Sequence, residues 1–225
     1  MLTPETLGFL RTLDRNNTKD WFDGHRDAYE AAHADLLAAA ETLRDHADHY
    51  DPRAAKANPD LGKCLTRIRR DPRFSKGKPP FKTDFFLMLN PTGDRQGTAG
   101  YFLHVEPGNC YAGASYFVTQ PEPLGRIRDR LVARFEAWQA IVEGAEARKV
   151  FPDGVESPTS LKRAPRGYDP NHPAAEYLRM KGFGLHHRIA DKTLVGDPGL
   201  DVVLGAMKAA RPFVDFINTA IADRA

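Results

Sequence analysis

Apolar residues recur every three or four positions in three stretches of the chain, which is the spacing of one face of an α-helix. The stretches cover residues 17–47, 124–142 and 197–217. In the first, Asn17 and Thr18 are candidates for the helix N-cap, and the pattern fits one long helix or two in sequence. In the third, we expect Pro212 to bend the helix or to split it.

Between the first two helical stretches the pattern changes to short runs of β-forming residues separated by turn residues. The runs cover residues 85–90, 101–106 and Tyr111 to Val118, with turn residues at 90–94 and 107–109. This arrangement predicts an antiparallel meander. Further strands are expected over residues 63–69 and 183–189. The sequence therefore predicts one α+β domain over residues 1–225, with an antiparallel sheet of four or more strands flanked by helices.

The predicted core lies where one face of the sheet meets helices. We expect the helices that begin near Asp20 and Leu124 to cover that face. Trp21 and Trp138 lie on the apolar sides of these two helices, so both should be largely buried. A shorter helix is expected near residues 174–180.

The overall charge does not point to a partner. Thirty-two Lys and Arg residues face thirty Asp and Glu residues, so no net field draws the molecule toward nucleic acid or a membrane. The N-terminal segment lacks the pattern of a signal peptide, and no run of about 18 apolar residues occurs. We therefore expect a cytoplasmic protein with no membrane partner, in which Cys64 and Cys110 are free core residues.

The basic residues are unevenly distributed, and residues 67–83 hold the strongest cluster. Seven of these seventeen residues are basic and one, Asp71, is acidic. Three prolines and a glycine restrict the backbone, so the cations should be held in place. Arginine suits bidentate contacts to phosphate, and lysine adds charge. The candidate ligand-binding residues are Arg67, Arg69, Asp71, Arg73, Lys76, Lys78 and Lys82.

A structural interpretation of this cluster has equal weight. Asp71 would pair with Arg69 or Arg73 and fix the loop, while the other cations are solvated, because ion-pair networks resemble functional sites. Under either interpretation we expect Phe74 and Phe81 to anchor the segment in the core rather than to stack on a ligand.

A second basic loop covers residues 162–173 and contains three candidate ligand-binding residues: Arg166, Tyr168 and His172. His172 could act as an acid or base near neutral pH or donate to phosphate, or it could cap the helix that starts after Pro173. Tyr168 could likewise be a half-buried aromatic residue whose hydroxyl is hydrogen-bonded. For both, the structural role is the expected one.

Several of these motifs resemble one protein family. The stretch RIRRDPRFSKGKPPFKT is similar to the R-x-x-RD-x-RFSKDK-x-PYKT signature of the family known as domain of unknown function 2461. Residues 16–26 and 165–173 resemble two further motifs of that family. The chain departs from the signatures at Gly77, Phe81 and Arg166, where the family has an acidic residue, Tyr and Lys. The resemblance implies an α+β fold but no reaction.

Other signals are weaker. His104 and Glu106 should share one face of a strand, whereas His186 and His187 should point to opposite faces. Neither pair completes a metal-ligand set, so no metal and no cofactor are expected. The chain also lacks the motifs of α/β-hydrolases, P-loop proteins, Rossmann dehydrogenases and zincins.

Three functions compete on this evidence. The first is binding of a phosphorylated or other anionic small molecule in a cleft between the two basic loops. The second is nucleic-acid binding, with the basic segment along the backbone and aromatic residues stacked on bases. The third is docking onto an acidic protein partner. Whether the protein is an enzyme, and its oligomeric state, stay open.

Overall fold

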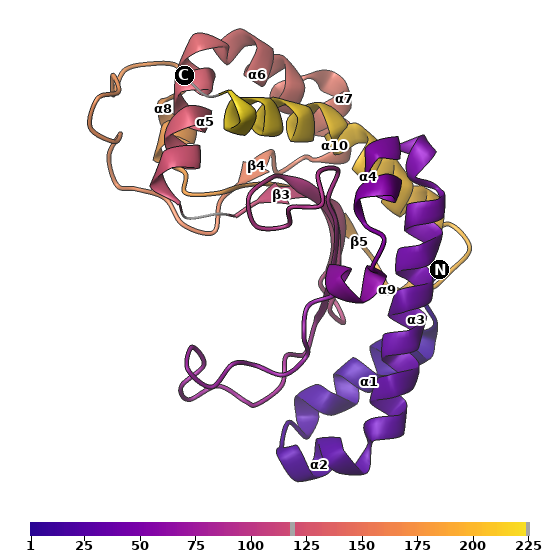
Figure 1. The fold of residues 1–225 in the computed structure, drawn as a ribbon. Coiled ribbons are helices and arrows are strands. Elements are labelled where there is room, and N and C mark those ends of the chain that lie inside the picture. The colour runs from indigo at the N-terminus through magenta and orange to yellow at the C-terminus, as the bar shows by residue number, and fades with distance from the viewer. Residues whose placement is uncertain (118–119, 224–225) are drawn as a thin grey trace.

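The centre of the molecule is a five-stranded antiparallel sheet (Figure 1). The computed structural model describes residues 1–117 and 120–223. The strands are β1 (Phe85–Leu89), β2 (Gly100–Val105), β3 (Cys110–Tyr116), β4 (Val155–Glu156) and β5 (Phe183–Ile189), in the order β1-β2-β3-β5-β4. The predicted meander and α+β class are confirmed, and the end of the predicted third strand at Val118 lies outside the described residues. The short strand β4 was not predicted.

Ten helices accompany this sheet in the described part of the chain. They are α1 (Pro4–Arg15), α2 (Lys19–Gly24), α3 (Arg26–Asp45), α4 (Pro52–Ala57), α5 (Pro121–Ala133), α6 (Phe135–Glu143), α7 (Ala145–Val150), α8 (Ala175–Arg179), α9 (Asp191–Leu194) and α10 (Gly199–Ala222). Two 3₁₀ turns, η1 (Ala47–His49) and η2 (Leu61–Cys64), flank α4. Helices α10 and α3 pack directly on the sheet, α10 on β2, β3 and β5 and α3 on β1. The helical stretch expected to begin near Leu124 covers the sheet only in part. Trp138 of α6 packs against Phe183 of β5, whereas α5 and α6 otherwise pack on α10.

The two tryptophans occupy different environments. Trp138 is fully buried and packs against Phe213 and Phe216 of α10. Trp21 is only half-buried and stacks on His25, with 4.0 Å between ring centroids. The prediction is thus confirmed for Trp138 and wrong for Trp21, because α2 lies at the far end of α1 and α3, away from the sheet (Figure 1).

Three local predictions also need correction. Residues 63–69 form no continuous strand and pair only at the isolated bridges from Leu65 to Leu87 and from Arg69 to Phe81. The predicted helix over residues 124–142 is interrupted at Arg134, whose φ of −135° is not helical. Helix α10 runs through Pro212 without interruption, so of the two expected effects the split is wrong, while the bend stays a prediction.

Two further sequence predictions concern cysteines and membranes. Cys64 and Cys110 are both free and buried, as expected. Among the helices at residues 1–117 and 120–223, none combines the length and the apolar character that a membrane crossing requires.

Candidate functional site

Residues 67–83 form an arm that extends away from the sheet just before β1 (Figure 1). Two backbone hydrogen bonds hold the two sides of the arm together. They run from Arg70 N to the Pro80 carbonyl (2.9 Å) and from Lys82 N to the Ile68 carbonyl (2.8 Å). Phe81 anchors its base, as predicted, because its ring is buried and stacks on Phe22.

Asn17 also holds the base of the arm. Its side-chain amide donates to the Phe81 carbonyl (3.0 Å), and its side-chain oxygen accepts from the Phe81 backbone N–H (3.1 Å). Thr18, rather than Asn17, caps α2, because its side chain accepts from the Trp21 backbone N–H. Asn17 therefore ties the helical hairpin of α1 and α2 to the arm.

At the tip of the arm, Asp71 is paired with Arg73. The Arg73 Nη2 lies 2.6 Å from Oδ2 of Asp71, and the Arg73 backbone N–H donates to Oδ1 at 3.0 Å. These hydrogen bonds hold the pKa of Asp71 below its ordinary value. Phe74 is 83% exposed, and the Arg73 guanidinium carbon lies 5.5 Å from the centre of its ring. The expectation that Phe74 anchors the core is wrong, because the tip projects into solvent.

The other cations of the arm are spread along its length. Arg67, Arg69, Lys76 and Lys78 are exposed, and Lys82 is half-buried at the base. Lys82 lies close to Asp84, which follows the arm. Burial alone would raise the pKa of Asp84, but the bond to His104 and the nearby charges hold it below its ordinary value. The arm therefore offers an extended basic surface.

The second basic loop is held in place by Tyr168. The Tyr168 hydroxyl donates to Oδ1 of Asp129 at 2.7 Å and lies 3.3 Å from the Gly125 carbonyl, so the loop is tied to α5. Burial and the hydrogen bond to Asp129 raise the pKa of Tyr168 to about 12. Gly167 before it has a φ of 95°, a conformation that favours glycine. Tyr168 thus has the structural role expected from its type.

His172 is also a structural residue. Its Nδ1 accepts a hydrogen bond from the backbone N–H of Ala174 at 3.0 Å, directly before α8. Its ring lies edge-on to Phe135, with 6.0 Å between centroids. The geometry shows the local cap, and the role of His172 as an acid, a base or a phosphate donor stays a prediction.

The loop borders a cavity of about 630 Å³. Three arginines line it, Arg163, Arg166 and Arg179, together with Ala164, Pro165, Gly167, Tyr168, Pro170 and Ala175. None of these lining residues is acidic, and within the described part of the chain none of the three arginines forms an ion pair. We refer to Arg163, Arg166 and Arg179 as the arginine triad.

Backbone pairing explains why the triad is assembled. The Leu161 N–H donates to the Arg179 carbonyl at 2.7 Å, and the Lys181 N–H donates to the Thr159 carbonyl at 3.0 Å. Arg163 follows this paired segment by two residues, so it lies close to Arg179. The sequence singled out Arg166 but missed Arg163 and Arg179 as ligands, because their proximity depends on this pairing.

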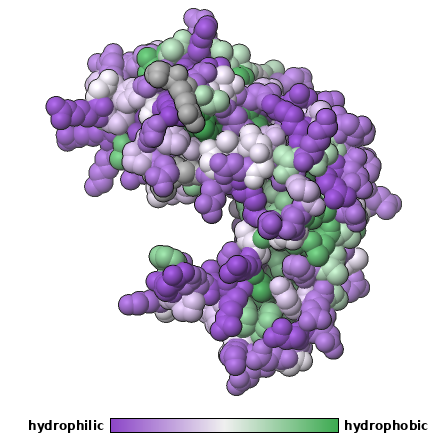
Figure 2. Space-filling model, viewed as in Figure 1, coloured by the Kyte–Doolittle hydropathy of each residue, from purple (hydrophilic) through white to green (hydrophobic). Residues whose placement is uncertain are grey.

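The two basic loops are separate in space. Figure 1 places the arm at one end of the concave side of the molecule and the 157–173 loop at the other end, and Figure 2 shows the hollow between these two parts. No residue of the arm lines the cavity at Arg166. The structure therefore does not bring Arg73 and Arg166 into one pocket.

A further group of polar and aromatic side chains lies on the face of the sheet opposite α10. His186 donates from Nδ1 to Glu156 (2.8 Å), and Nε2 of His104 lies 3.6 Å from Oδ2 of Asp84. Tyr111 stacks on His104, with centroids 4.3 Å apart. His187 instead bonds to the Val150 carbonyl, so the two neighbouring histidines point to opposite faces as predicted.

His104 and Glu106, which were expected on one face of a strand, have different partners. The Glu106 carboxylate accepts from the Asn109 side chain, and His104 faces Asp84 instead. Among the residues that the structure describes, no group of three or more His, Cys, Asp and Glu side chains is arranged to hold a metal ion.

The comparison with known proteins assigns the family. The family described as Conserved hypothetical protein (DUF2461) matches residues 5–216. The chain belongs to this family. No curated protein and no solved structure matches it. The range matched to DUF2461 includes both the arm and the arginine triad, and the family description states no activity, so the function has to be argued from the geometry.

Proposed function

We propose that the protein binds a phosphorylated or similarly anionic small molecule at the arginine triad. The observation that carries this proposal is that Arg163, Arg166 and Arg179 line one cavity, to which the described residues contribute no carboxylate. The proposal keeps the ligand class that the sequence favours. It moves the site from the space between the two basic loops to the second loop alone.

The chemistry of the guanidinium group supports an oxyanion ligand. Each guanidinium presents a planar set of N–H donors that matches two oxygens of a phosphate group. Three cations around one cavity repel each other, and no neighbouring acid within the described ranges offsets that repulsion by an ion pair. An oxyanion would reverse this balance, because it attracts all three cations at once.

The loop is ordered before any ligand arrives. Tyr168 ties it to α5, and Arg128 of α5 donates to the carbonyls of Leu178 and Met180 on either side of Arg179. Pro165 and Pro170 restrict the backbone between these ties. A cation on an ordered loop loses less conformational entropy on binding, which favours affinity.

The size of the cavity sets the scale of the ligand. A volume of about 630 Å³ falls within the range of about 300–1,000 Å³ that is usual for small-molecule pockets. A single phosphate group would contact the triad, and the rest of the molecule would occupy the remaining space. The arm is a separate basic surface and is not required for this contact.

The test is calorimetric titration of the purified protein with inorganic pyrophosphate at low ionic strength. Arg166→Ala should weaken binding by about 1.5 to 3 kcal/mol, the range for a hydrogen bond to a charged group. Lys162→Ala is the matched control, because it removes an exposed cation next to the triad that does not line the cavity. Equal losses in both variants, or no heat in the wild type, would contradict the proposal.

Titration with a single-stranded oligonucleotide tests the nucleic-acid alternative. Such binding would use the arm, would fall steeply with salt, and would weaken in Arg67→Ala or Lys76→Ala protein. If those arm variants lose pyrophosphate binding while Arg166→Ala keeps it, the arm and not the triad is the anion site.

A further inference from the structure

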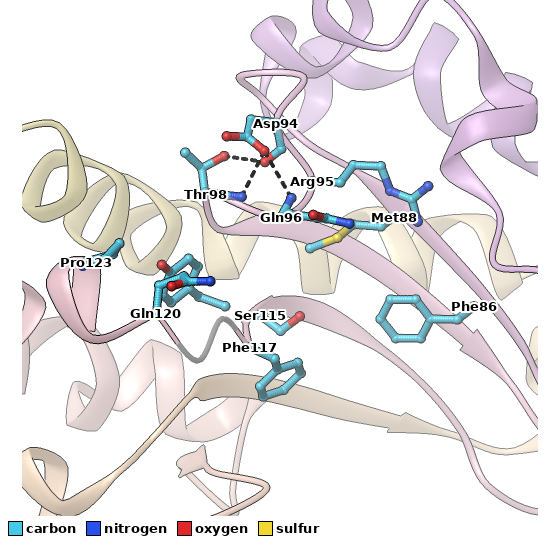
Figure 3. A pocket seen from close by; sticks show the side chains of 12 residues that line it. Phe86, Met88, Asp94, Arg95, Gln96, Thr98, Ser115, Phe117, Gln120 and Pro123 are labelled. Atoms are coloured by element: carbon cyan, nitrogen blue, oxygen red, sulfur yellow. Dashed lines mark hydrogen bonds between the residues drawn. The ribbon is translucent and has the colours of Figure 1, made fainter. Parts of the chain in front are cut away.

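A second pocket lies on the face of the sheet opposite α10, away from the arginine triad. Its volume is about 620 Å³, and it lies between the open face of the sheet and the turn before β2 (Figure 3). Phe86 of β1 and Phe117 after β3 line it with their rings, and Arg95 lines it from the turn. Asp94 of the same turn also lines it, and its Oδ1 accepts hydrogen bonds from the turn backbone rather than pairing with Arg95. We refer to this pocket as the sheet cleft.

Arg95 has no ion-pair partner among residues 1–117 and 120–223. Its Nε is buried, and no residue that the structure describes accepts a hydrogen bond from it. Burial lowers the pKa of Arg95 from its ordinary value. A partly desolvated guanidinium is costly unless something compensates its charge. The natural compensation at the wall of an open pocket is an anionic group of a ligand.

The turn that carries Arg95 is held by a dense set of hydrogen bonds. The buried Asn90 side chain accepts from Thr92 N (2.8 Å) and donates to the Ala99 carbonyl (3.2 Å). Oδ1 of Asp94 accepts from Gln96 N at 3.1 Å, a bond drawn in Figure 3, and also from Gly97 N. Arg95 therefore projects from a fixed backbone rather than from a loose loop.

The two phenylalanine rings that line the sheet cleft are each held by contacts with neighbouring residues. Phe117 is 43% exposed, and its ring lies on the backbone of Gly182 and Gly184, where an added Cβ would come within 2.8 and 3.0 Å of it. The two glycines therefore make room for the ring. On the other side, Phe86 stacks on the fully buried Phe102, with centroids 5.2 Å apart.

We propose that the sheet cleft binds a small molecule that combines a planar aromatic ring with an anionic group. The ring would lie against Phe86 and Phe117, and the anion would pair with Arg95. Aromatic stacking is favourable because ring faces and edges carry opposite partial charges, and it adds to the gain from apolar burial. A nucleoside monophosphate has both features and serves as the probe.

The experiment compares AMP with its two halves, adenosine and ribose 5-phosphate, by calorimetric titration. All titrations use Arg166→Ala protein, in which phosphate binding at the arginine triad is weakened, and ribose 5-phosphate measures what remains of it. AMP should bind at least tenfold more tightly than either half. Adding Arg95→Gln should lower the affinity for AMP at least tenfold, to that of adenosine, and leave adenosine binding unchanged.

Substitutions of the two phenylalanines test the contribution of ring stacking. Phe117→Leu should lower the affinities for AMP and adenosine by a similar factor of about five to ten and leave ribose 5-phosphate unchanged. Because Phe117 is exposed, this variant should keep the wild-type unfolding midpoint, which Phe86→Leu need not do. If AMP binds no better than ribose 5-phosphate, or if Arg95→Gln leaves its affinity unchanged, the assignment of the sheet cleft is wrong. That result would leave the arginine triad unaffected, because the two sites share no lining residue.

Discussion

The hydroxyl of Tyr168 lies 2.7 Å from Oδ1 of Asp129, and this hydrogen bond joins the loop of the arginine triad to α5. Tyr168→Phe removes the bond but keeps the ring. We expect a loss of about 1 kcal/mol in the free energy of unfolding, which is usual for one hydrogen bond. Because Arg166 and Arg163 lie on the same loop, pyrophosphate affinity should also fall, by about threefold to tenfold. Calorimetry and urea unfolding measure the two effects, and unchanged pyrophosphate affinity would show that the bond does not order the triad.

The same bond predicts a dependence on alkaline pH. The pKa of Tyr168 is raised from 10.0 to about 12, so the folded protein holds this proton more tightly than the unfolded chain does. Its contribution to stability is therefore fully present below pH 10 and is lost as the pH rises through 12. The difference in unfolding midpoint between wild type and Tyr168→Phe should shrink over that window. A constant difference from pH 9 to pH 12 would contradict the assignment.

The two tryptophans should differ in their contribution to stability. Trp138→Ala removes a fully buried side chain and should lower the free energy of unfolding by about 3 to 5 kcal/mol. Trp21→Ala should cost clearly less, because Trp21 is half-buried and stacks on His25 at the surface. Urea unfolding measures both losses. Equal losses would mean that α2 is part of the central core.

The pairing of Asp71 with Arg73 predicts a local effect on the arm. Asp71→Asn removes the charge but keeps an oxygen for the Arg73 backbone N–H, whereas Asp71→Ala removes both interactions. NMR relaxation should therefore show a more mobile Arg73 side chain in both variants and a more mobile Arg73 backbone only in Asp71→Ala. The free energy of unfolding should hardly change in either variant, because the pair is exposed and screened by solvent. A rigid Arg73 side chain in Asp71→Asn would contradict this role.

The fold was predictable where the local pattern agrees with the tertiary structure. The strands β1, β2, β3 and β5 were found from β-rich runs bounded by turn residues. The break at Arg134 was not, because arginine favours helix and no glycine or proline marks the change of backbone conformation there. Strand β4 was not predictable either, because it has only two residues and is defined by its pairing with β5.

The candidate sites were predictable only in part. Arg166 and Tyr168 stand in one basic loop, so a local count of charges finds them. Arg179 lies on α8, outside that loop, and joins the triad through backbone pairing that no local pattern contains. Arg95 is a single cation in a turn, and its importance comes from burial without a partner. Both features depend on the tertiary structure, so the local sequence does not reveal them.

The central claim is that an oxyanion binds at the arginine triad rather than at the arm, and NMR tests it most directly. Each arginine gives its own Nε–Hε signal, so one titration with inorganic pyrophosphate reports on all of them. The signals of Arg163, Arg166 and Arg179 should shift together along one binding curve, while that of Arg73 should stay in place because it is paired with Asp71. Shifts confined to the arm, with the triad unchanged, would contradict the account.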